Sequence, residues 1–450
     1  MSESPKQKKG FFSRILDFID GFRRVVINLL FLVFLGFFIF TIYTAYNSSK
    51  GVLQPESAAL VLAPQGVVVD QLAYVDPVSH LAGPSPIAET LLSDLIEAVD
   101  KAKDDQQIKM LVLWLDDLEH IGISKAGELG AAIDRFKTSK KPVVAVGELL
   151  DQDSYYLAAY ADEIIIHPMG GVAIEGFSVY RNYYKTALEK LSIDFHVFKV
   201  GDFKSAMEPF IRDDMSAEAK AANKAWLEQL WRQYTVDIAK RRKILVTDFS
   251  RYINDIDQVL AAEGGSAAKA ALSNGLVDKV LTDPEMRDAL IAHVGADEEN
   301  NFNQVFYRDY LRRDRLAELT SPKIDKPSVG LIVARGNIMT GDQPTGVIGS
   351  DNLKRLIRDA AADKNIKALV LRIDSGGGSA FASEVIRNEL NLLQAAGKPL
   401  VVSMGRVAAS GGYWIAAAAD EIWATSSTLT GSIGIFGAFP TFDRSLEKLG

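Results

Sequence analysis

The longest predominantly apolar stretch of the chain lies near its start, at residues 25–46 (VVINLLFLVFLGFFIFTIYTAY). None of these 22 residues is charged. A helix rising about 1.5 Å per residue would be about 33 Å long here, enough to cross a hydrocarbon core of about 30 Å. A cleaved signal peptide has a shorter apolar core, and Tyr43, Tyr46 and Asn47 are poor cleavage positions. The pattern therefore favours a transmembrane signal anchor over a buried core helix.

Basic residues flank this apolar run asymmetrically. Only Lys50 follows it closely, whereas six basic residues precede it: Lys6, Lys8, Lys9, Arg14, Arg23 and Arg24. Because positively charged flanks stay in the cytoplasm, residues 1–24 are predicted to form a cytoplasmic N-terminal segment. The remainder of the chain is then predicted to be exported.

After the anchor the sequence repeats itself at an offset of 258 residues. KMLVLWLD (109–116) aligns with KALVLRID (367–374), and residues 160–164 align with residues 418–422. Between these matches, KKPVVAVG (140–147) corresponds to GKPLVVSMG (397–405) with one residue inserted. Agreement at several separate places indicates a tandem duplication. The polar segment SPKIDKP (321–327) is the predicted boundary, which gives domains at 47–321 and 322–450.

Within each repeat, apolar runs alternate with amphipathic stretches. Short, branched apolar runs at 111–115, 143–146, 369–373 and 400–403 predict strands that are buried on both faces. Amphipathic patterns at 91–103 and 352–362 predict helices before the first strand of each pair. Strands that alternate with helices predict an α/β fold with mostly parallel sheets.

A long helix is predicted from about residue 217 to residue 243, with Ser216 as its N-cap. Four large side chains on it are interpreted as core or inter-subunit packing rather than as a ligand cage: Trp226, Leu230, Trp231 and Tyr234.

Composition narrows the possible classes of protein. Apolar residues make up 48% of the 450 positions and charged residues 24%, which excludes a disordered chain, a collagen and a coiled-coil rod. The net charge of −8 gives no reason to expect a nucleic-acid partner. Since the chain has no cysteine, it has neither a thiol nucleophile nor a Cys-ligated zinc. Its five histidines all lie in the first repeat: His80, His120, His167, His196 and His293.

A glycine-rich segment follows one predicted strand of the second repeat. It reads DSGGGS (374–379) and precedes a helical pattern at 384–394. Glycines at a strand end let the backbone direct N–H groups outward toward an anion. The same composition also suits a simple tight turn, and no lysine follows as a phosphate-binding loop would require.

A serine follows the next predicted strand, in VAASGGY (407–413). Ser410 stands where a strand is expected to turn into a helix, which is the setting of a nucleophile elbow. A helix that starts with small residues packed closely against a neighbour explains the segment equally well.

A serine nucleophile needs a base, and the histidines lack a triad context. A lysine kept neutral by burial can take this role. Lys204, in GDFKSAMEPF (201–210), lies among small and aromatic residues. From the residues alone, an ordinary surface lysine remains the alternative.

Four motifs together resemble the signal peptide peptidase A (protease IV) family in its long, membrane-anchored, duplicated bacterial form. They are GDFKSAMEPFIRDDMS (201–216), VLRIDSGGGSAFASEVIR (370–387), VAASGGYWIAAAADEI (407–422) and TLTGSIGIFG (428–437). With the anchor and the repeat, the resemblance covers nearly the whole chain. It implies two Clp protease/crotonase-like α/β domains in tandem after one transmembrane helix.

The resemblance also implies the roles of individual residues. Ser410 would be the nucleophile, Lys204 the general base, and Ser432 the hydroxyl that hydrogen-bonds the base. Gly377 and Gly411 would donate N–H groups to the oxyanion, with Gly378 close by. The family usually has Asn-Ser-Pro-Gly-Gly-Ser where this chain has DSGGGS (374–379), so the oxyanion loop is expected to be less preorganised.

The repeat offers a check that does not depend on the resemblance. At the offset of 258, Gln152 lies opposite Ser410, and Glu119 and His120 lie opposite Gly377 and Gly378. The first repeat therefore lacks the nucleophile and the glycine loop but contains Lys204. Whether the two repeats meet within one chain or between chains stays open at this stage. The position opposite Lys204 would be 462, so we interpret the 450-residue chain as truncated or a fragment.

Together with the topology predicted from the charged flanks, the resemblance implies a serine endopeptidase of the bacterial inner membrane with a periplasmic catalytic body. The resemblance implies signal peptides and other apolar peptides as substrates, a lipid bilayer as surroundings and a homotetramer as assembly. No cofactor or metal is expected. The alternatives are a crotonase-like acyl-thioester enzyme and an inactive assembly module.

Overall fold

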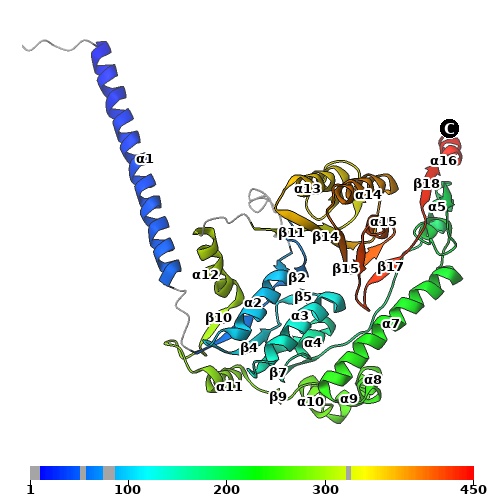
Figure 1. Cartoon of the computed structure of the whole chain (residues 1–450), viewed down its shortest axis with the longest axis horizontal. Helices are drawn as coiled ribbons and strands as arrows, with labels where there is room; N and C mark the ends of the chain where they lie inside the picture. Colours follow the sequence, from blue (N-terminus) through cyan, green and yellow to red (C-terminus); the bar gives the residue numbers. More distant parts are fainter. Residues whose placement is uncertain (1–10, 51–56, 74–86, 321–325) are drawn as a thin grey trace, which may run out of the picture. The chain divides into compact units, whose positions relative to one another are not determined.

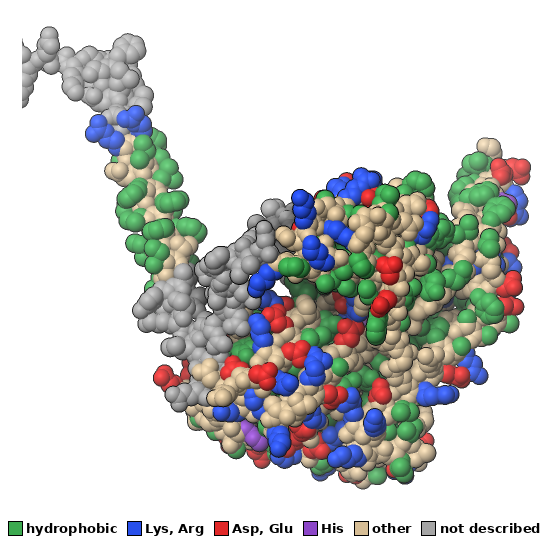
Figure 2. All heavy atoms as spheres, in the orientation of Figure 1, with side chains coloured by type: hydrophobic (Ala, Val, Ile, Leu, Met, Phe, Trp, Pro, Cys, Tyr) green, Lys and Arg blue, Asp and Glu red, His purple; other side chains and the backbone are tan. Residues whose placement is uncertain are grey.

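The computed structural model describes residues 11–50, 57–73, 87–320 and 326–450. Its N-terminal unit contains helix α1 (Phe11–Lys50). The span Gly21–Tyr43 within α1 has a mean hydropathy of 2.8 and is long and apolar enough to cross a membrane. Figure 2 shows its apolar side chains as a continuous green surface, with blue basic side chains at one end. A helix of the expected character therefore covers the predicted anchor at 25–46.

The second unit, Pro55–Gly450, contains two large parallel sheets. The first sheet belongs to the first repeat, and its helices cover both faces (Figure 1). Continuous burial explains the unbroken apolar runs, and the strands predicted at 111–115 and 143–146 are confirmed. In order across the sheet, its strands are β10 (Gln304–Phe306), β1 (Ala58–Leu62), β4 (Ile108–Trp114), β6 (Val143–Leu150), β7 (Glu163–Val172) and β9 (Lys279–Val280). The covering helices are α2 (Leu92–Asp104), α3 (Gly122–Lys137) and α4 (Gln152–Ala158) on one face and α11 (Asp283–Val294) on the other.

The second sheet repeats the order of the first. Its main strands are β11 (Ser328–Arg335), β14 (Ile366–Ser375), β15 (Leu400–Ala409) and β16 (Glu421–Trp423), and β17 (Leu429–Gly431) pairs with the far end of β15. The accompanying helices are α13 (Ser350–Ala362), α14 (Ala380–Ala395) and α15 (Gly411–Ala416). They follow the strands in the same order as α2, α3 and α4. The predicted α/β class with duplicated, parallel strand–helix units is thus confirmed.

The exact domain limits 47–321 and 322–450 stay a prediction. The proposed boundary, SPKIDKP (321–327), lies largely outside the described residues, as do His80 and residues 1–10 of the predicted cytoplasmic segment.

A two-stranded sheet joins the repeats. Strand β8 (Asp194–Lys199) from the first repeat pairs antiparallel with β18 (Phe436–Thr441) from the second. Figure 1 shows β18 beside the short helix α5 (Lys185–Lys190), away from the two large sheets. Because Lys204 follows β8 closely in the chain, this pairing brings it to the second repeat. The remaining small sheets are β2 (Gly66–Val69) with β3 (Glu89–Leu91) and β5 (Leu118–His120), and β12 (Ile338–Met339) with β13 (Ile348–Gly349).

The predicted long helix is α7 (Ala217–Arg242), and the Ser216 side chain accepts a hydrogen bond from the Ala219 N–H at 3.1 Å. Tyr234 is buried and stacks on Trp231, which confirms the packing interpretation for these two rings. The other helices are α6 (Glu208–Ile211), α8 (Val246–Asn254), α9 (Ile256–Ala262), α10 (Ala267–Ser273), α12 (Tyr307–Thr320) and α16 (Asp443–Leu449).

Candidate active site

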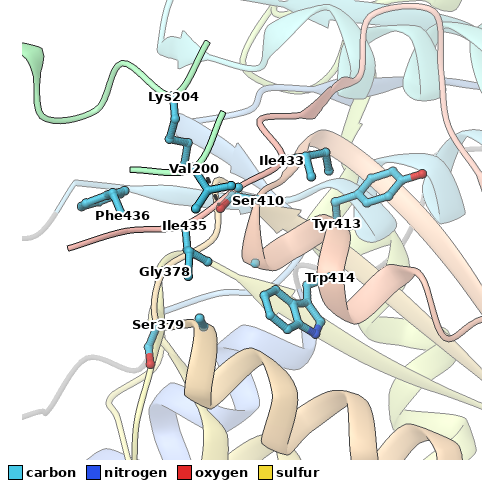
Figure 3. A pocket seen from close by; sticks show the side chains of 13 residues that line it. Val200, Lys204, Gly378, Ser379, Ser410, Tyr413, Trp414, Ile433, Ile435 and Phe436 are labelled. Atoms are coloured by element: carbon cyan, nitrogen blue, oxygen red, sulfur yellow. Dashed lines mark hydrogen bonds between the residues drawn. The ribbon is translucent and has the colours of Figure 1, made fainter. Parts of the chain in front are cut away.

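Lys204 and Ser410 meet across the two repeats within one chain. The Lys204 side-chain nitrogen Nζ lies 3.0 Å from the Ser410 hydroxyl oxygen Oγ. Figure 3 shows the Lys204 side chain extending toward Ser410 from a different segment of the chain. The sequence alone left open whether the two repeats meet within one chain or between chains. In this structure they meet within one chain.

Ser410 stands at the turn between β15 and α15. Its backbone has φ 51° and ψ −117°, an unusual conformation for a residue with a side chain. Such a conformation costs about 1–3 kcal/mol and persists only where neighbouring structure enforces it. Here the Ser410 N–H donates to the Gly431 carbonyl at 2.8 Å, and the Ser410 carbonyl accepts from the Trp414 N–H at 2.9 Å. The turn therefore has the geometry of a nucleophile elbow.

The Lys204 side chain is held by Ser432. Its Nζ donates to the Ser432 carbonyl at 2.6 Å and lies 3.1 Å from the Ser432 hydroxyl. Lys204 is only 8% exposed, and no described carboxylate forms an ion pair with it. Burial without a compensating negative charge lowers the pKa of Lys204 from its ordinary value of 10.5. A lysine in this setting loses its proton more readily than a surface lysine.

The glycine loop after β14 approaches Ser410 closely. Gly377 and Gly378 have φ of +99° and +154°. A Cβ on Gly377 would lie 2.6 Å from the Gly411 nitrogen, and one on Gly378 would lie 2.1 Å from the Ile338 carbonyl oxygen. Both positions therefore require glycine, for conformation and for space.

Gly377 forms a hydrogen bond within its own loop. Its N–H donates to the Ser375 hydroxyl at 3.1 Å, and Gly377 does not line the cavity beside Ser410. Gly378 and Gly411 do line this cavity, and a Cβ on Gly411 would come within 3.2 Å of the Gly378 nitrogen. Gly378 rather than Gly377 therefore lies beside the cavity with Gly411, and the oxyanion roles of these N–H groups stay a prediction.

Ser375, which the sequence did not single out, fixes this loop. Its hydroxyl donates to the Gly336 carbonyl at 2.7 Å while accepting from the Gly377 N–H. A serine directly before consecutive glycines is the local signal that points to such an anchor, because short hydroxyl side chains bond to nearby backbone groups.

The cavity beside Ser410 has a volume of about 660 Å³ and mostly apolar walls. Its large apolar lining residues are Val200, Tyr413, Trp414, Ile433, Ile435 and Phe436 (Figure 3). The Ser410 hydroxyl and the Lys204 amine thus lie at the wall of a mostly apolar pocket.

None of the four described histidines lines this cavity. In the first repeat, the positions opposite Gly378 and Gly411 are His120 and Asp153, which contact each other at 2.5 Å. Gln152, opposite Ser410, accepts from the Gly176 N–H at 2.7 Å. Side chains thus occupy the equivalent of the glycine-lined site in the first repeat. The described residues also contain no cluster of three or more His, Cys, Asp or Glu side chains that could hold a metal ion.

Comparison with known proteins identifies similar sequences. The model of peptidase family S49 matches residues 135–295 and 393–450. The chain is 40% identical to Protease 4 of Salmonella typhi, over 98% of this chain and 71% of that protein. It is 38% identical to Protease 4 of Haemophilus influenzae, over 97% of this chain and 71% of that protein. Serine protease SPPA of Arabidopsis chloroplasts is 30% identical over 80% of this chain and 52% of its own length.

Among solved structures, the 1510-N membrane-bound stomatin-specific protease aligns with a TM-score of 0.29 at 14% identity. The alignment covers 58% of this chain and 98% of that chain.

Proposed function

This chain belongs to peptidase family S49 and is a serine peptidase, and from that premise we propose that Ser410 is its nucleophile and Lys204 its general base. The observation that carries this proposal is the 3.0 Å separation between Lys204 Nζ and Ser410 Oγ. The burial that lowers the pKa of Lys204 supports it, because only a neutral amine can accept a proton.

The proposed reaction begins with neutral Lys204 taking the proton of the Ser410 hydroxyl. Oγ then attacks the peptide carbonyl carbon and forms a tetrahedral intermediate with a negative oxygen. The N–H groups of Gly378 and Gly411 hold this oxyanion. Protonated Lys204 passes its proton to the leaving amine as the peptide bond breaks. Water then attacks the carbonyl carbon of the acyl-enzyme while Lys204 accepts a proton from this water. The ester bond to Ser410 Oγ breaks, Lys204 returns the proton to Oγ, and the second product leaves as a carboxylic acid.

Ser432 orients the base in this scheme. Its carbonyl accepts a hydrogen bond from Lys204 Nζ at 2.6 Å, and its hydroxyl lies 3.1 Å from the same nitrogen. A carbonyl acceptor fixes the amine without adding a negative charge, which would raise the pKa of Lys204.

The proposed substrates are signal peptides remaining after cleavage and other apolar peptides. The apolar walls of the cavity support an apolar substrate, and helix α1 supports a location at the bilayer. We further propose a single-pass protein of the bacterial inner membrane, with residues 1–24 in the cytoplasm and the catalytic body in the periplasm, assembled as a homotetramer. An acyl-thioester enzyme is disfavoured by family membership, and an inactive module by the contact between Lys204 and Ser410.

The test is labelling and turnover with the full-length protein in detergent. A fluorophosphonate probe should label the wild-type chain and should fail to label Ser410→Ala. The same substitution should lower cleavage of an apolar reporter peptide by several orders of magnitude. Ser426→Ala is the matched control, since this serine of the second repeat is exposed and lies outside the cavity lining. Equal labelling of Ser410→Ala and wild type would refute the assignment.

A further inference from the structure

A buried cluster of charges lies between the two repeats. Lys125, on α3 of the first repeat, places its Nζ 2.8 Å from Asp374 Oδ2 and 3.3 Å from Asp70 Oδ2. Arg372 of the second repeat lies 3.2 Å from Asp70 Oδ1 and 2.6 Å from Glu128 Oε1. The Lys125 side chain is 7% exposed and that of Asp374 10%. Charges that are buried this far remain ionised only when they are paired.

Asp374 stands at the base of the proposed oxyanion loop. It precedes Ser375, whose hydroxyl fixes Gly377. Its second carboxylate oxygen, Oδ1, accepts from the Val407 N–H at 3.2 Å, three residues before Ser410. Its carbonyl oxygen accepts from the Gly336 N–H at 3.0 Å. One side chain thus ties the glycine loop to the strand that ends at the nucleophile.

The charge state of Asp374 depends on its basic neighbours. Burial by itself would raise the pKa of this carboxyl group, but the Lys125 ammonium and, more weakly, Arg406 hold the pKa below its usual value. Ionised Asp374 therefore keeps both oxygens as acceptors, one for Lys125 and one for the Val407 backbone.

The first repeat contains the same aspartate without the lysine. Asp116, opposite Asp374, accepts from the Glu148 N–H at 2.6 Å, which is the same tether between neighbouring strands. Asp116 is exposed, and in the described part of the chain no basic side chain pairs with it. The position of the second repeat that corresponds to Lys125 is Ser383. Among the described residues, an ion pair with a lysine is thus present at Asp374 and not at Asp116.

We propose that Lys125 is a positioning residue of the active site. Its ammonium fixes Asp374, and through Asp374 it fixes both the glycine loop and the strand leading to Ser410. The catalytic half therefore receives two lysines from the other repeat, Lys204 as the proposed base and Lys125 as the ion-pair partner of Asp374. This inference rests on the proposed function, since it assigns Lys125 to the same site.

The first measurement is backbone hydrogen exchange in the full-length protein, which does not depend on turnover. Lys125→Met should speed exchange in peptides covering 374–379 and 407–411. Lys125→Arg should exchange as slowly as the wild type, because arginine keeps the positive charge beside Asp374. Lys137→Met is the matched control. Lys137 lies on the same helix and forms an ion pair with Asp162 at 2.6 Å, away from Asp374 in the chain. Unchanged exchange in Lys125→Met, or equal changes in Lys137→Met, would refute the positioning role.

The second measurement is peptide cleavage by the same variants. Lys125→Met should lower kcat about ten- to hundredfold while KM changes less than about twofold, because the cavity walls remain intact. Asp374→Asn retains an acceptor for the Val407 N–H and removes the charge that Lys125 balances. Combined with Lys125→Met, it should therefore recover part of the lost kcat. If kcat falls only in proportion to the fraction of protein that is folded, the role of Lys125 is purely structural and the proposal is wrong. Altered exchange without Ser410-dependent cleavage by the wild type would instead refute the proposed function.

Discussion

Lys204 Nζ lies 3.0 Å from Ser410 Oγ although 206 positions separate the two residues in the chain. The contact joins one repeat to the other, and the pairing of β8 with β18 fixes the segments that carry the two side chains. In the first repeat, Gln152 stands where the nucleophile would be, and its side chain accepts a backbone hydrogen bond. The duplication has thus produced two similar folds with different contributions to one site.

Substitutions of Lys204 test its role as base. Lys204→Arg keeps a positive charge that is not lost at working pH, so it should be as inactive as Lys204→Ala. Lys204→Met should also be inactive, with kcat/KM lower than wild type by at least about a thousandfold. Activity measurements should be accompanied by thermal melting. An active Lys204→Arg protein would leave Ser410 without its base.

The pH dependence of activity follows from the lowered pKa of Lys204. Since the neutral amine is the active form, kcat/KM should rise with pH through this pKa and level off before the ordinary value of 10.5. A rate profile that falls or stays flat across this range would contradict a lysine base.

The same pKa shift has a consequence for stability. The unfolded chain binds a proton on Lys204 more tightly than the folded protein does. Between the lowered pKa and 10.5, folding therefore becomes more favourable as pH rises. Lys204→Met removes this dependence, so at neutral pH the variant should melt at the same temperature as wild type or higher. A lower melting temperature would indicate that the lysine is retained for stability.

Gly411 and Gly376 form a matched pair for testing the oxyanion site. A Cβ on Gly411 would lie 2.6 Å from the hydroxyl oxygen of the fully buried Ser383, whereas one on Gly376 would meet nothing within 4 Å. Gly411→Ala keeps the backbone N–H, but the clash should displace this donor from the oxyanion and reduce kcat about a hundredfold or more, the size of effect seen when an oxyanion donor is removed. Gly376→Ala should stay within about threefold of wild type. Steady-state kinetics on both variants decides, and similar losses in the two would contradict the assigned geometry.

Ser432→Ala tests the orientation of the base. The variant loses the hydroxyl at 3.1 Å from Lys204 Nζ but keeps the carbonyl at 2.6 Å. Loss of one hydrogen bond worth about 1 kcal/mol should lower kcat/KM about fivefold. Ser426→Ala again serves as the control. A loss as complete as that of Ser410→Ala would assign Ser432 a step in the chemistry itself.

Membrane topology can be measured with a reporter. A phosphatase that is active only outside the cytoplasm, fused after residue 60, should be active, because six basic residues precede the apolar span. The same fusion without residues 25–46 should be inactive. Activity of a cytoplasm-specific reporter at the same site would reverse the predicted orientation.

Local sequence was sufficient to predict several features of this protein. The uncharged run at 25–46 predicts a long apolar helix, because backbone groups in lipid must be satisfied within the helix. The unbroken apolar runs predict buried parallel strands, and the offset of 258 predicts two similar units. Ser410 between small residues predicts a strand-to-helix turn, since only small neighbours permit such a tight approach.

Other features depended on contacts between distant residues, which only the tertiary structure decided. The glycine loop was visible in the sequence, but its backbone conformation was not. The Gly377 N–H donates to the Ser375 hydroxyl, and Gly378 lines the cavity. The pairing of β8 with β18 buries Lys204 against Ser432, and that burial lowers its pKa. Lys125 lies in an amphipathic helix and shows no sequence signal, because its partner Asp374 is 249 positions away. The charge state and position of a side chain depend on what surrounds it in space, and those neighbours come from the other repeat.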